Sequence, residues 1–295
     1  LVATDEVDGR LGYGDPVALR GAGGMVTWLA AEGATVTRGK PIYRVDGDPV
    51  VLLYGPLPVY RPLASGVEGA DVRQFEQNLA ALGYDGFTVD DDYTSATASA
   101  VRSWQEDLGA PVTGTVTATL VAYAPGPIRV AAHNAEVGAP AGGAVLSYTG
   151  TRRLVTIDLP VADRDLAVAG AAATIQLPDG KTARGKVATV GAVATAAQPD
   201  AEPTVEVTVT VADEKALGDL REAPVDVELT AESRADVLTV PVAALVALAE
   251  GGYGLQVLDG ATSHFVAVET GLFASGRVEV SGAGVAEGMA VGMPS

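Results

Sequence analysis

The residues of this chain that could perform chemistry are few and far apart. Its two histidines are His133 and His264, and it contains no cysteine. A zinc peptidase needs two or three histidines and a carboxylate at ligand spacing, and a thiol nucleophile needs a cysteine. The sequence also lacks a Gly-x-Ser-x-Gly elbow and a Ser-x-x-Lys box. We therefore expect a protein that is not an enzyme and that carries neither a cofactor nor a metal.

Two further patterns have weaker chemical interpretations. The carboxylates of Asp85, Asp90, Asp91 and Asp92 could coordinate Ca²⁺, but their spacing is not that of an EF-hand. A solvated loop between helices is the preferred interpretation. The glycine-rich stretch 21–24 lacks the Lys-Ser/Thr pair and the helix that follow a phosphate-binding loop, and it is interpreted as a turn.

Composition limits the class of protein further. The chain has 295 residues, of which 48% are hydrophobic, so several packed domains are expected. A formal charge of −18 excludes a nucleic-acid surface and a polybasic membrane patch. Solubility explains this acidity best, and an acidic face for a cationic partner is the alternative. The longest uncharged apolar run, 237–249, is shorter than the roughly 20 residues that span a bilayer.

Two similar β-rich half-motifs organise the first half of the chain. One covers residues 31–42 and the other covers residues 135–146. An offset of 104 residues aligns Ala31 with Ala135, and at that offset Val26 meets Val130. Two similar halves separated by an insertion are typical of a scaffold that projects another element.

The insertion between the halves has helical periodicity. Val72, Phe75, Leu79 and Leu82 form an apolar stripe, followed by Gly83 at a position suited to a left-handed C-cap. A second helix is predicted over about 94–108, with Thr94 as its N-cap and Gly109 as its stop.

Beyond residue 126 the pattern changes to alternating strands. Val155, Ile157 and Leu159 alternate with polar residues, which is typical of a half-buried strand. The run Pro178-Asp179-Gly180 predicts a hairpin turn, because Pro fixes φ and Gly accepts a positive φ. A short helical segment is expected over 213–219.

The insert resembles the peptidoglycan-binding domain 1 family. The residues that carry this resemblance are Gly69-Ala70-Asp71-Val72, Leu82-Gly83-Tyr84, Trp104-Gln105 and Val112-Thr113-Gly114. The resemblance implies a three-helix module that tethers envelope proteins to the cell wall. Its candidate wall-ligand contacts are Tyr84, Tyr93, Arg102 and Trp104, since aromatic rings stack on sugar or peptide faces and Arg pairs with carboxylates. For Trp104 the helical spacing favours a place in the core, and ligand contact is the alternative.

The rest of the chain resembles periplasmic adaptor, or membrane fusion, proteins. The half-motifs are similar to their lipoyl-like barrel-sandwich hybrid, 175–187 to their β-barrel, and 237–292 to their membrane-proximal domain. The resemblance implies a mainly β, multidomain chain in which the usual coiled-coil hairpin is replaced by the helical module. No lipoylation is expected, because the insert occupies the place of the carrier lysine.

The predicted domains are a lipoyl-like first half at 13–58, the helical module at 59–124, the second half at 125–151, a β-barrel at 152–232 and a membrane-proximal domain at 233–295. Residues 1–12 are expected to return and complete one of the last two units, and they are assigned to the membrane-proximal domain. Because the chain begins with Leu1, an N-terminal membrane anchor is expected upstream of it.

The resemblance implies a non-enzymatic extracytoplasmic adaptor subunit of an efflux or export complex, anchored to the cytoplasmic membrane. The expected partners are an integral-membrane transporter of the ABC class, of MacB type, and peptidoglycan; a homo-oligomer is also compatible. The alternative is a wall-anchored structural or sensory envelope protein that regulates cell-wall enzymes.

Overall fold

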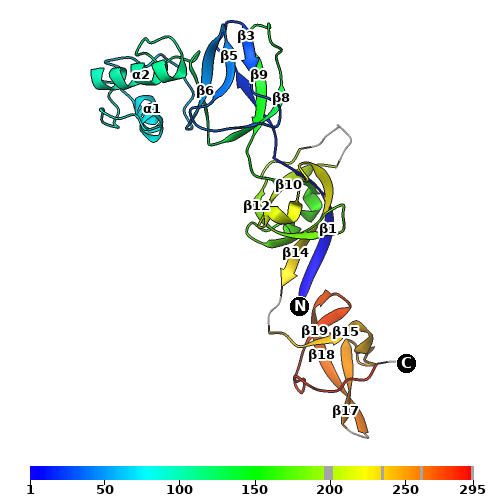
Figure 1. The fold of residues 1–295 in the computed structure, drawn as a ribbon. Helices are drawn as coiled ribbons and strands as arrows, with labels where there is room; N and C mark the ends of the chain where they lie inside the picture. Colours follow the sequence, from blue (N-terminus) through cyan, green and yellow to red (C-terminus); the bar gives the residue numbers. More distant parts are fainter. Residues whose placement is uncertain (196–201, 234–235, 260–261, 294–295) are drawn as a thin grey trace. The chain divides into compact units, whose positions relative to one another are not determined.

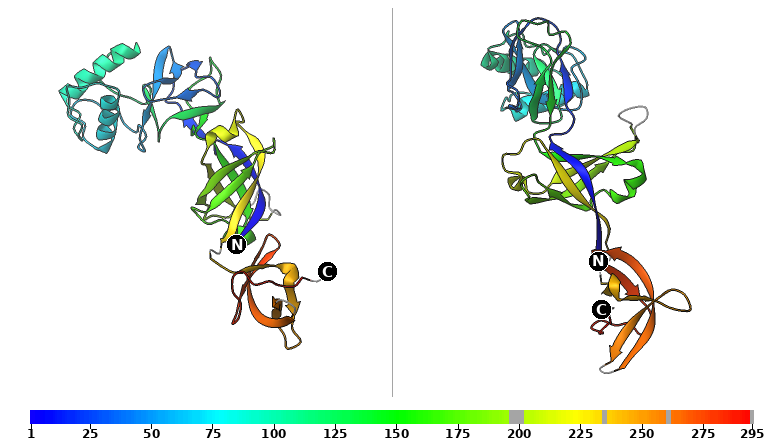
Figure 2. Two further views of the ribbon diagram at one scale, coloured as in Figure 1. Left: turned by 60° about the horizontal axis from the view of Figure 1, so that its bottom comes forward. Right: turned by 90° about the vertical axis from the view of Figure 1, so that its right-hand side faces the viewer.

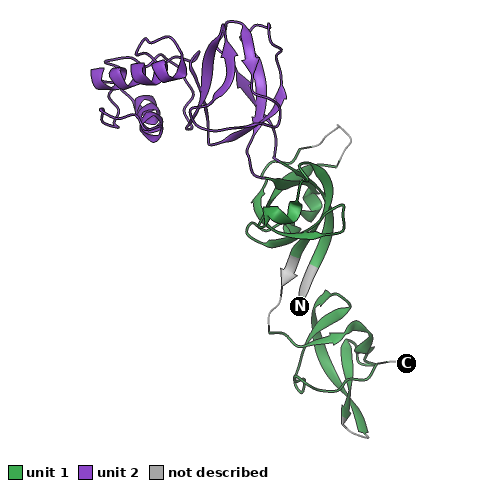
Figure 3. Ribbon diagram, in the orientation of Figure 1, with its two compact units in different colours: residues 1–12, 153–295 green, residues 13–152 purple. Residues whose placement is uncertain are grey.

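The computed structural model describes residues 1–195, 202–233, 236–259 and 262–293. They form two compact units (Figure 3), one comprising residues 13–152 and the other residues 1–12 together with 153–295. Each unit is described below by itself.

The first unit contains a sandwich of two four-stranded sheets (Figure 1). One sheet has the order β2-β9-β8-β4, with β2 at Val17–Arg20, β9 at Ala144–Thr149, β8 at Ile128–His133 and β4 at Thr35–Val36. The other has the order β3-β5-β6-β7, with β3 at Val26–Leu29, β5 at Pro41–Val45, β6 at Asp48–Tyr54 and β7 at Val121–Ala124. Apolar side chains from both sheets share one core.

The two half-motifs are hydrogen-bonded to each other in this sandwich. Strand β4 of the first half pairs with β8 of the second, in the register Thr35↔Arg129. The Val26 amide donates to the Ala139 carbonyl at 2.9 Å, and the Gly138 amide donates to the Val26 carbonyl at 2.7 Å. Neither half can satisfy its backbone alone, which confirms the predicted split barrel-sandwich hybrid.

Two helices form the insert, α1 at Ala70–Ala81 and α2 at Ser95–Leu108. The three-helix expectation was wrong for this chain, because residues 118–120 make only a turn. In this turn the Thr117 carbonyl accepts from the amides of Leu120 and Val121. Strand β7 begins at Val121, so no residues remain to extend the turn into a helix.

Strand β6 contributes to two cores at once. Val50 and Leu52 point into the sandwich, whereas Val51 and Leu53 pack against the helices. All four are at most 1% exposed. Because successive side chains of a strand point to opposite faces, this uninterrupted apolar run is buried on both sides. The helical module is therefore a third layer on the sandwich.

The second unit contains a closed six-stranded barrel in the order β1-β10-β13-β12-β11-β14. The strands are β1 at Val2–Gly12, β10 at Leu154–Pro160, β13 at Thr204–Val211, β12 at Thr182–Val190, β11 at Ala172–Gln176 and β14 at Ala223–Ser233. The predicted Asp179-Gly180 turn joins β11 and β12, and Gly180 has a φ of 80°.

Residues 1–12 complete the barrel, which corrects their assignment to the C-terminal domain. Strand β1 pairs with β14 in the register Val7↔Val227 and with β10 in the register Leu11↔Val155, so it closes the cylinder (Figure 2). The reason is burial: Leu11 is fully buried in the barrel core, and Val7 packs against that core.

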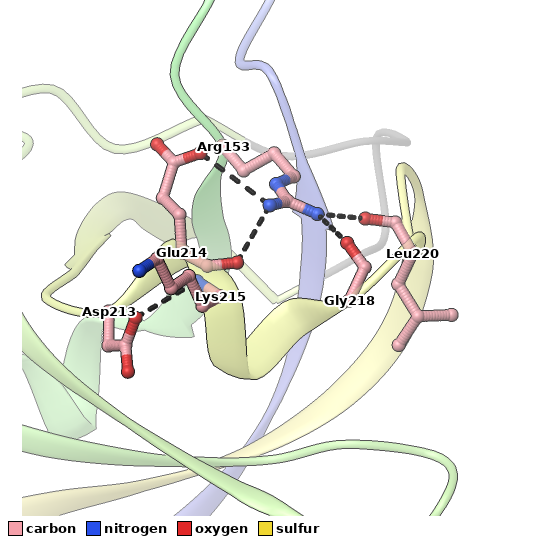
Figure 4. Close-up of polar contacts among 6 residues, drawn as sticks. All are labelled: Arg153, Asp213, Glu214, Lys215, Gly218 and Leu220. Carbon is pink, nitrogen blue, oxygen red and sulfur yellow. Dashed lines mark hydrogen bonds and ion pairs between the residues drawn. The ribbon is translucent and has the colours of Figure 1, made fainter.

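Two 3-10 helices, η1 (Val161–Leu166) and η2 (Glu214–Leu217), accompany the barrel. Arg153 fixes η2 by donating to three backbone carbonyls, those of Glu214, Gly218 and Leu220, at 2.7–2.9 Å (Figure 4). The η2 segment lies within the stretch 213–219 that was expected to be helical.

The C-terminal residues form a five-stranded sheet in the order β15-β19-β18-β17-β16. Its elements are β15 at Thr239–Pro241, η3 at Val242–Ala244, β16 at Leu245–Ala247, β17 at Tyr253–Asp259, β18 at Thr262–Ala274 and β19 at Arg277–Ser281. Strand β14 of the barrel ends at Ser233. The two residues after it, next to the predicted boundary at 232/233, lie outside the described residues.

Candidate functional site

The helical module holds the predicted ligand contacts, and local signals place its second helix. Thr94 caps α2 by accepting from the Thr97 amide, and the Thr97 side chain accepts from the Thr94 amide in return. Gly109 ends the helix in the left-handed conformation, with a φ of 65°. The predicted N-cap and stop of this helix are confirmed.

Two of the four predicted contact residues lie in the core. Trp104 and Tyr93 are 2% and 1% exposed, and both pack around Phe75, with ring centroids 5.7 and 6.4 Å away. The Tyr93 hydroxyl donates to the Gly114 carbonyl at 2.8 Å, and burial raises its pKa. In this conformation neither ring offers a face to a ligand.

Tyr84 and Arg102 remain accessible, although the structure does not bring them together. Tyr84 is half-buried and donates to Asp107 Oδ2 at 2.7 Å. Burial, followed by the Asp107 carboxylate, raises the pKa of Tyr84 to about 12. Arg102 is exposed on the same helix as Asp107, five residues earlier, which is roughly 140° around the helix axis. A ligand that touched both would have to wrap around α2.

Arg102 lies over the turn that follows α2. Gly114 has a φ of 74°, and a Cβ there would come within 3.0 Å of Arg102 Nε and 3.2 Å of the Ala98 carbonyl oxygen. The Arg102 guanidinium therefore packs against the backbone of Gly114, where a side chain would clash with it. Among the three arginines of residues 59–124, Arg61 and Arg73 form ion pairs with Asp71 and Asp91. Arg102 is the cation of this module best placed to meet an anionic group.

Buried polar side chains of α1 were missed by the sequence analysis. Glu76 is fully buried, and it accepts from the Thr97 hydroxyl at 2.7 Å and from the Asp90 amide at 3.0 Å. Burial raises the pKa of Glu76. This carboxylate links α1 to the capping box of α2 and to the acidic loop.

A second missed group attaches α1 to the sandwich. Gln74 and Asn78 are both buried. Gln74 exchanges two hydrogen bonds with the backbone of Leu57, at 2.9 and 2.8 Å, and Asn78 exchanges two with the backbone of Tyr54, at 2.8 and 2.7 Å. Amide side chains offer both a donor and an acceptor, so Asn78 satisfies an N–H and a C=O at the end of β6, and Gln74 satisfies those of Leu57, three residues further on. The module is thus fixed to the sandwich by polar as well as apolar contacts.

The acidic loop shows no metal-binding geometry. Asp91 pairs with Arg73 at 2.6 Å, and Asp90 accepts from the Asp92 amide at 2.9 Å. Across the described ranges, no group of three or more His, Cys, Asp or Glu side chains could hold a metal ion. The two histidines are far apart in the chain: His133 lies in β8, with Nε2 2.8 Å from the Ala30 carbonyl, and His264 lies in β18.

Three solved structures are similar to the whole chain. MacA from Actinobacillus actinomycetemcomitans matches with a TM-score of 0.54 at 14% identity, covering 100% of this chain and 97% of that one. A MacA–MexA chimeric protein with the Pseudomonas aeruginosa MexA α-hairpin domain matches at 0.50 and 15%, covering 96% and 94%. ZneB from Cupriavidus metallidurans matches at 0.42 and 17%, covering 99% and 88%.

These proteins are membrane fusion, or adaptor, proteins, and the chain has the fold of MacA. Within that fold, residues 68–122 match the family of putative peptidoglycan binding domains, as the sequence predicted. No curated protein matches the sequence significantly. In the part of the chain that the structure describes, neither helix is long and apolar enough to cross a membrane.

Proposed function

We propose that this protein is a non-enzymatic, extracytoplasmic adaptor subunit of an efflux or export complex, anchored to the cytoplasmic membrane. The observation that carries the proposal is the order of domains. A sandwich built from two half-motifs, a barrel and a C-terminal sheet follow one another in a fold that covers MacA almost completely. Scaffolding and coupling to transporter motion are the mechanism, and no covalent step is involved.

The proposed partner is an integral-membrane transporter, with the MacB-type ABC class favoured. An exposed apolar pair on the outer face of the C-terminal sheet supports a partner there. Phe265 and Leu258 are 59% and 42% exposed. Because Leu258 pairs with Ser263 in the register of β17 and β18, Phe265 is its diagonal neighbour on that face. Two large apolar side chains exposed on one face of the sheet suit a contact that removes them from water.

Co-purification tests the adaptor role. Tagged full-length protein, solubilised from membranes in mild detergent, is expected to retain a transporter permease that mass spectrometry identifies. Phe265→Glu should lose the permease, whereas Gln77→Glu, an exposed change on α1, should retain it. The proposed interface would be contradicted if Phe265→Glu retained the permease, or if the wild type retained none.

Wall attachment is the second part of the proposal, and it rests on the family match and on the accessible residues Tyr84 and Arg102. Purified sacculi should sediment the protein, and Arg102→Ala should reduce the bound fraction while Gln77→Ala does not. If sacculi sedimented the protein but no transporter co-purified, the alternative of a wall-anchored structural or sensory protein that regulates wall enzymes would be favoured.

A further inference from the structure

A cavity of about 860 Å³ opens on the sandwich, and its lining residues belong to the sandwich rather than to the helical module. It lies between β3 and the segment 133–144, and Trp28, His133, Asn134 and Glu136 are among the residues that line it. Trp28 is 41% exposed. An indole that is exposed inside a cavity of this size is unusual, because tryptophan side chains are mostly buried.

The walls of this cavity are already in place without a ligand. The backbone of 138–139 is hydrogen-bonded to Val26 of β3, two residues before Trp28. His133 is held from two sides, because its amide donates to Glu32 Oε1 at 2.8 Å and its Nε2 meets the Ala30 carbonyl at 2.8 Å. A ligand would therefore enter a site that needs little reorganisation, which favours binding.

The polar groups of the cavity include both donors and acceptors. The Ala30 carbonyl can only accept, so the His133 proton is on Nε2, and in the neutral ring Nδ1 is an acceptor. Asn134 uses its oxygen to accept from Ser147 Oγ at 2.6 Å, which leaves both protons of its amide nitrogen for a ligand. Glu136 is exposed and adds a carboxylate acceptor.

An N-acetylated sugar has complementary chemistry. Its C–H face is apolar and packs on an aromatic ring, while its acetamido group presents one N–H donor and one carbonyl acceptor. The Asn134 amide can donate to that carbonyl, and His133 Nδ1 or Glu136 can accept from that N–H. A purely apolar ligand would leave these polar groups unpaired in the contact, at a cost in affinity.

We propose that the cavity beside Trp28 is a second glycan-binding site, which takes N-acetylated sugar units of a wall strand. The site is separate from the helical module and would bring the sandwich itself into contact with the wall. The inference rests on the proposed function only for the presence of a glycan strand near the protein, because its own evidence is the cavity.

The two tryptophans make the test direct. Trp28 is 41% exposed and Trp104 is 2% exposed, so iodide quenching of the emission of the full chain reports mainly on Trp28. Chitotriose should protect this emission from iodide in a saturable way, and cellotriose, which lacks the acetamido groups, should protect it at least about tenfold less tightly. In Trp28→Phe, where Trp104 alone emits, chitotriose should change nothing.

Variants then separate this site from the helical module. Asn134→Ala keeps Trp28 as a reporter and should weaken chitotriose about tenfold, whereas Gln77→Ala, an exposed change on α1 of the module, should bind it as the wild type does. No protection of the wild type, or equal protection by cellotriose, would overturn the proposal. Protection that rises with protein concentration alone, with a larger species in sedimentation velocity, would assign the cavity to a second copy of the chain. Protection by chitotriose would stand even if no transporter co-purified.

Discussion

Asn78 and Tyr54 exchange two hydrogen bonds at the junction of the helical module and the sandwich. The Tyr54 amide donates to Asn78 Oδ1 at 2.8 Å, and Asn78 Nδ2 donates to the Tyr54 carbonyl at 2.7 Å. Gln74, one turn earlier on α1, repeats the arrangement with Leu57. Tyr54, the last residue of β6, is in register with Ala124 of β7, and its own N–H and C=O are satisfied by a helix.

Replacing Asn78 tests the energetic importance of this junction. Asn78→Ala leaves one N–H and one C=O of Tyr54 without partners near the core, so we expect the free energy of unfolding to fall by about 1–3 kcal/mol. Urea denaturation measures this change. Gln77→Ala, an exposed neighbour on the same helix, is the control and should stay within about 0.5 kcal/mol of the wild type. A neutral Asn78→Ala would show that the junction contributes little.

Leu53 tests whether the module and the sandwich share their stability. Leu53 is 1% exposed and lies in the core of the module, yet it belongs to a strand of the sandwich. Leu53→Ala should cost about 2–5 kcal/mol. In the Trp28→Phe background, where Trp104 alone emits, Leu53→Ala should lower the urea midpoint of the emission. In the protein with both tryptophans, it should lower the midpoint by the same amount. Two separate midpoints would mean that the insert unfolds on its own.

Asp71 should make acid stability depend on one ion pair. Arg61 contacts both carboxylate oxygens, Nε with Oδ2 at 2.7 Å and Nη2 with Oδ1 at 2.8 Å. The hydrogen bonds from Arg61 lower the pKa of Asp71 to about 2. A depressed folded-state pKa stabilises the protein above the unfolded value of about 3.9, and this stabilisation is lost as the pH falls toward 2.

The corresponding variant is Asp71→Asn. At neutral pH it should be less stable than the wild type, since Arg61 loses the carboxylate with which it pairs. Its stability should then decline less steeply than that of the wild type below about pH 4. Urea denaturation across this pH range measures both effects, and Asp85→Asn, on an exposed residue, is the control. Parallel pH profiles for Asp71→Asn and the wild type would contradict the assigned role.

Glu76 should have the opposite pH dependence. Burial raises its pKa, so protonation favours the folded state. Its contribution to stability is largest below the unfolded pKa of about 4.3 and is lost as the pH rises through the folded-state value. Relative to Glu76→Gln, the wild type should therefore gain stability as the pH is lowered from neutral toward the unfolded pKa of about 4.3. Glu106→Gln, exposed on α2, should give no such difference.

Much of this fold could be predicted from local signals in the sequence. Thr94 and Gly109 bound α2, Asp179-Gly180 forms the hairpin turn, and the two half-motifs make one sandwich. The cap, the stop and the turn depend on residues that favour one backbone conformation by themselves, whereas the sandwich was predicted from the repeated half-motif and its resemblance to the adaptor family. Local preference, acting over a few residues, is what a single sequence expresses most directly.

The junction could not be predicted in the same way. Gln74, Glu76 and Asn78 are polar residues on a helix, a pattern normally typical of a solvated face, and their partners are backbone groups 14–24 residues away or on the other helix. One signal was present: the run Val50 to Leu53 has no polar alternation, which is typical of a strand buried on both faces. It indicated that something must cover the outer face of β6.

The candidate contacts show a related limit. Tyr93 and Trp104 were chosen because aromatic rings bind sugars, but the same rings supply most of the apolar surface in a core of this size, and both are buried. Spacing alone does not separate the two uses. Tyr84 and Arg102 remain predictions for the wall contact.

Site-specific photo-crosslinking tests the adaptor role most directly. The photoreactive residue is placed at Phe265 or Leu258 in the membrane-anchored, full-length protein in cells, and the products are identified by mass spectrometry. The account predicts a crosslink to a transporter permease from both positions and none from Gln77 on α1. Crosslinks from both positions to wall enzymes alone, or none to any membrane protein while the chain is folded and abundant, would contradict it.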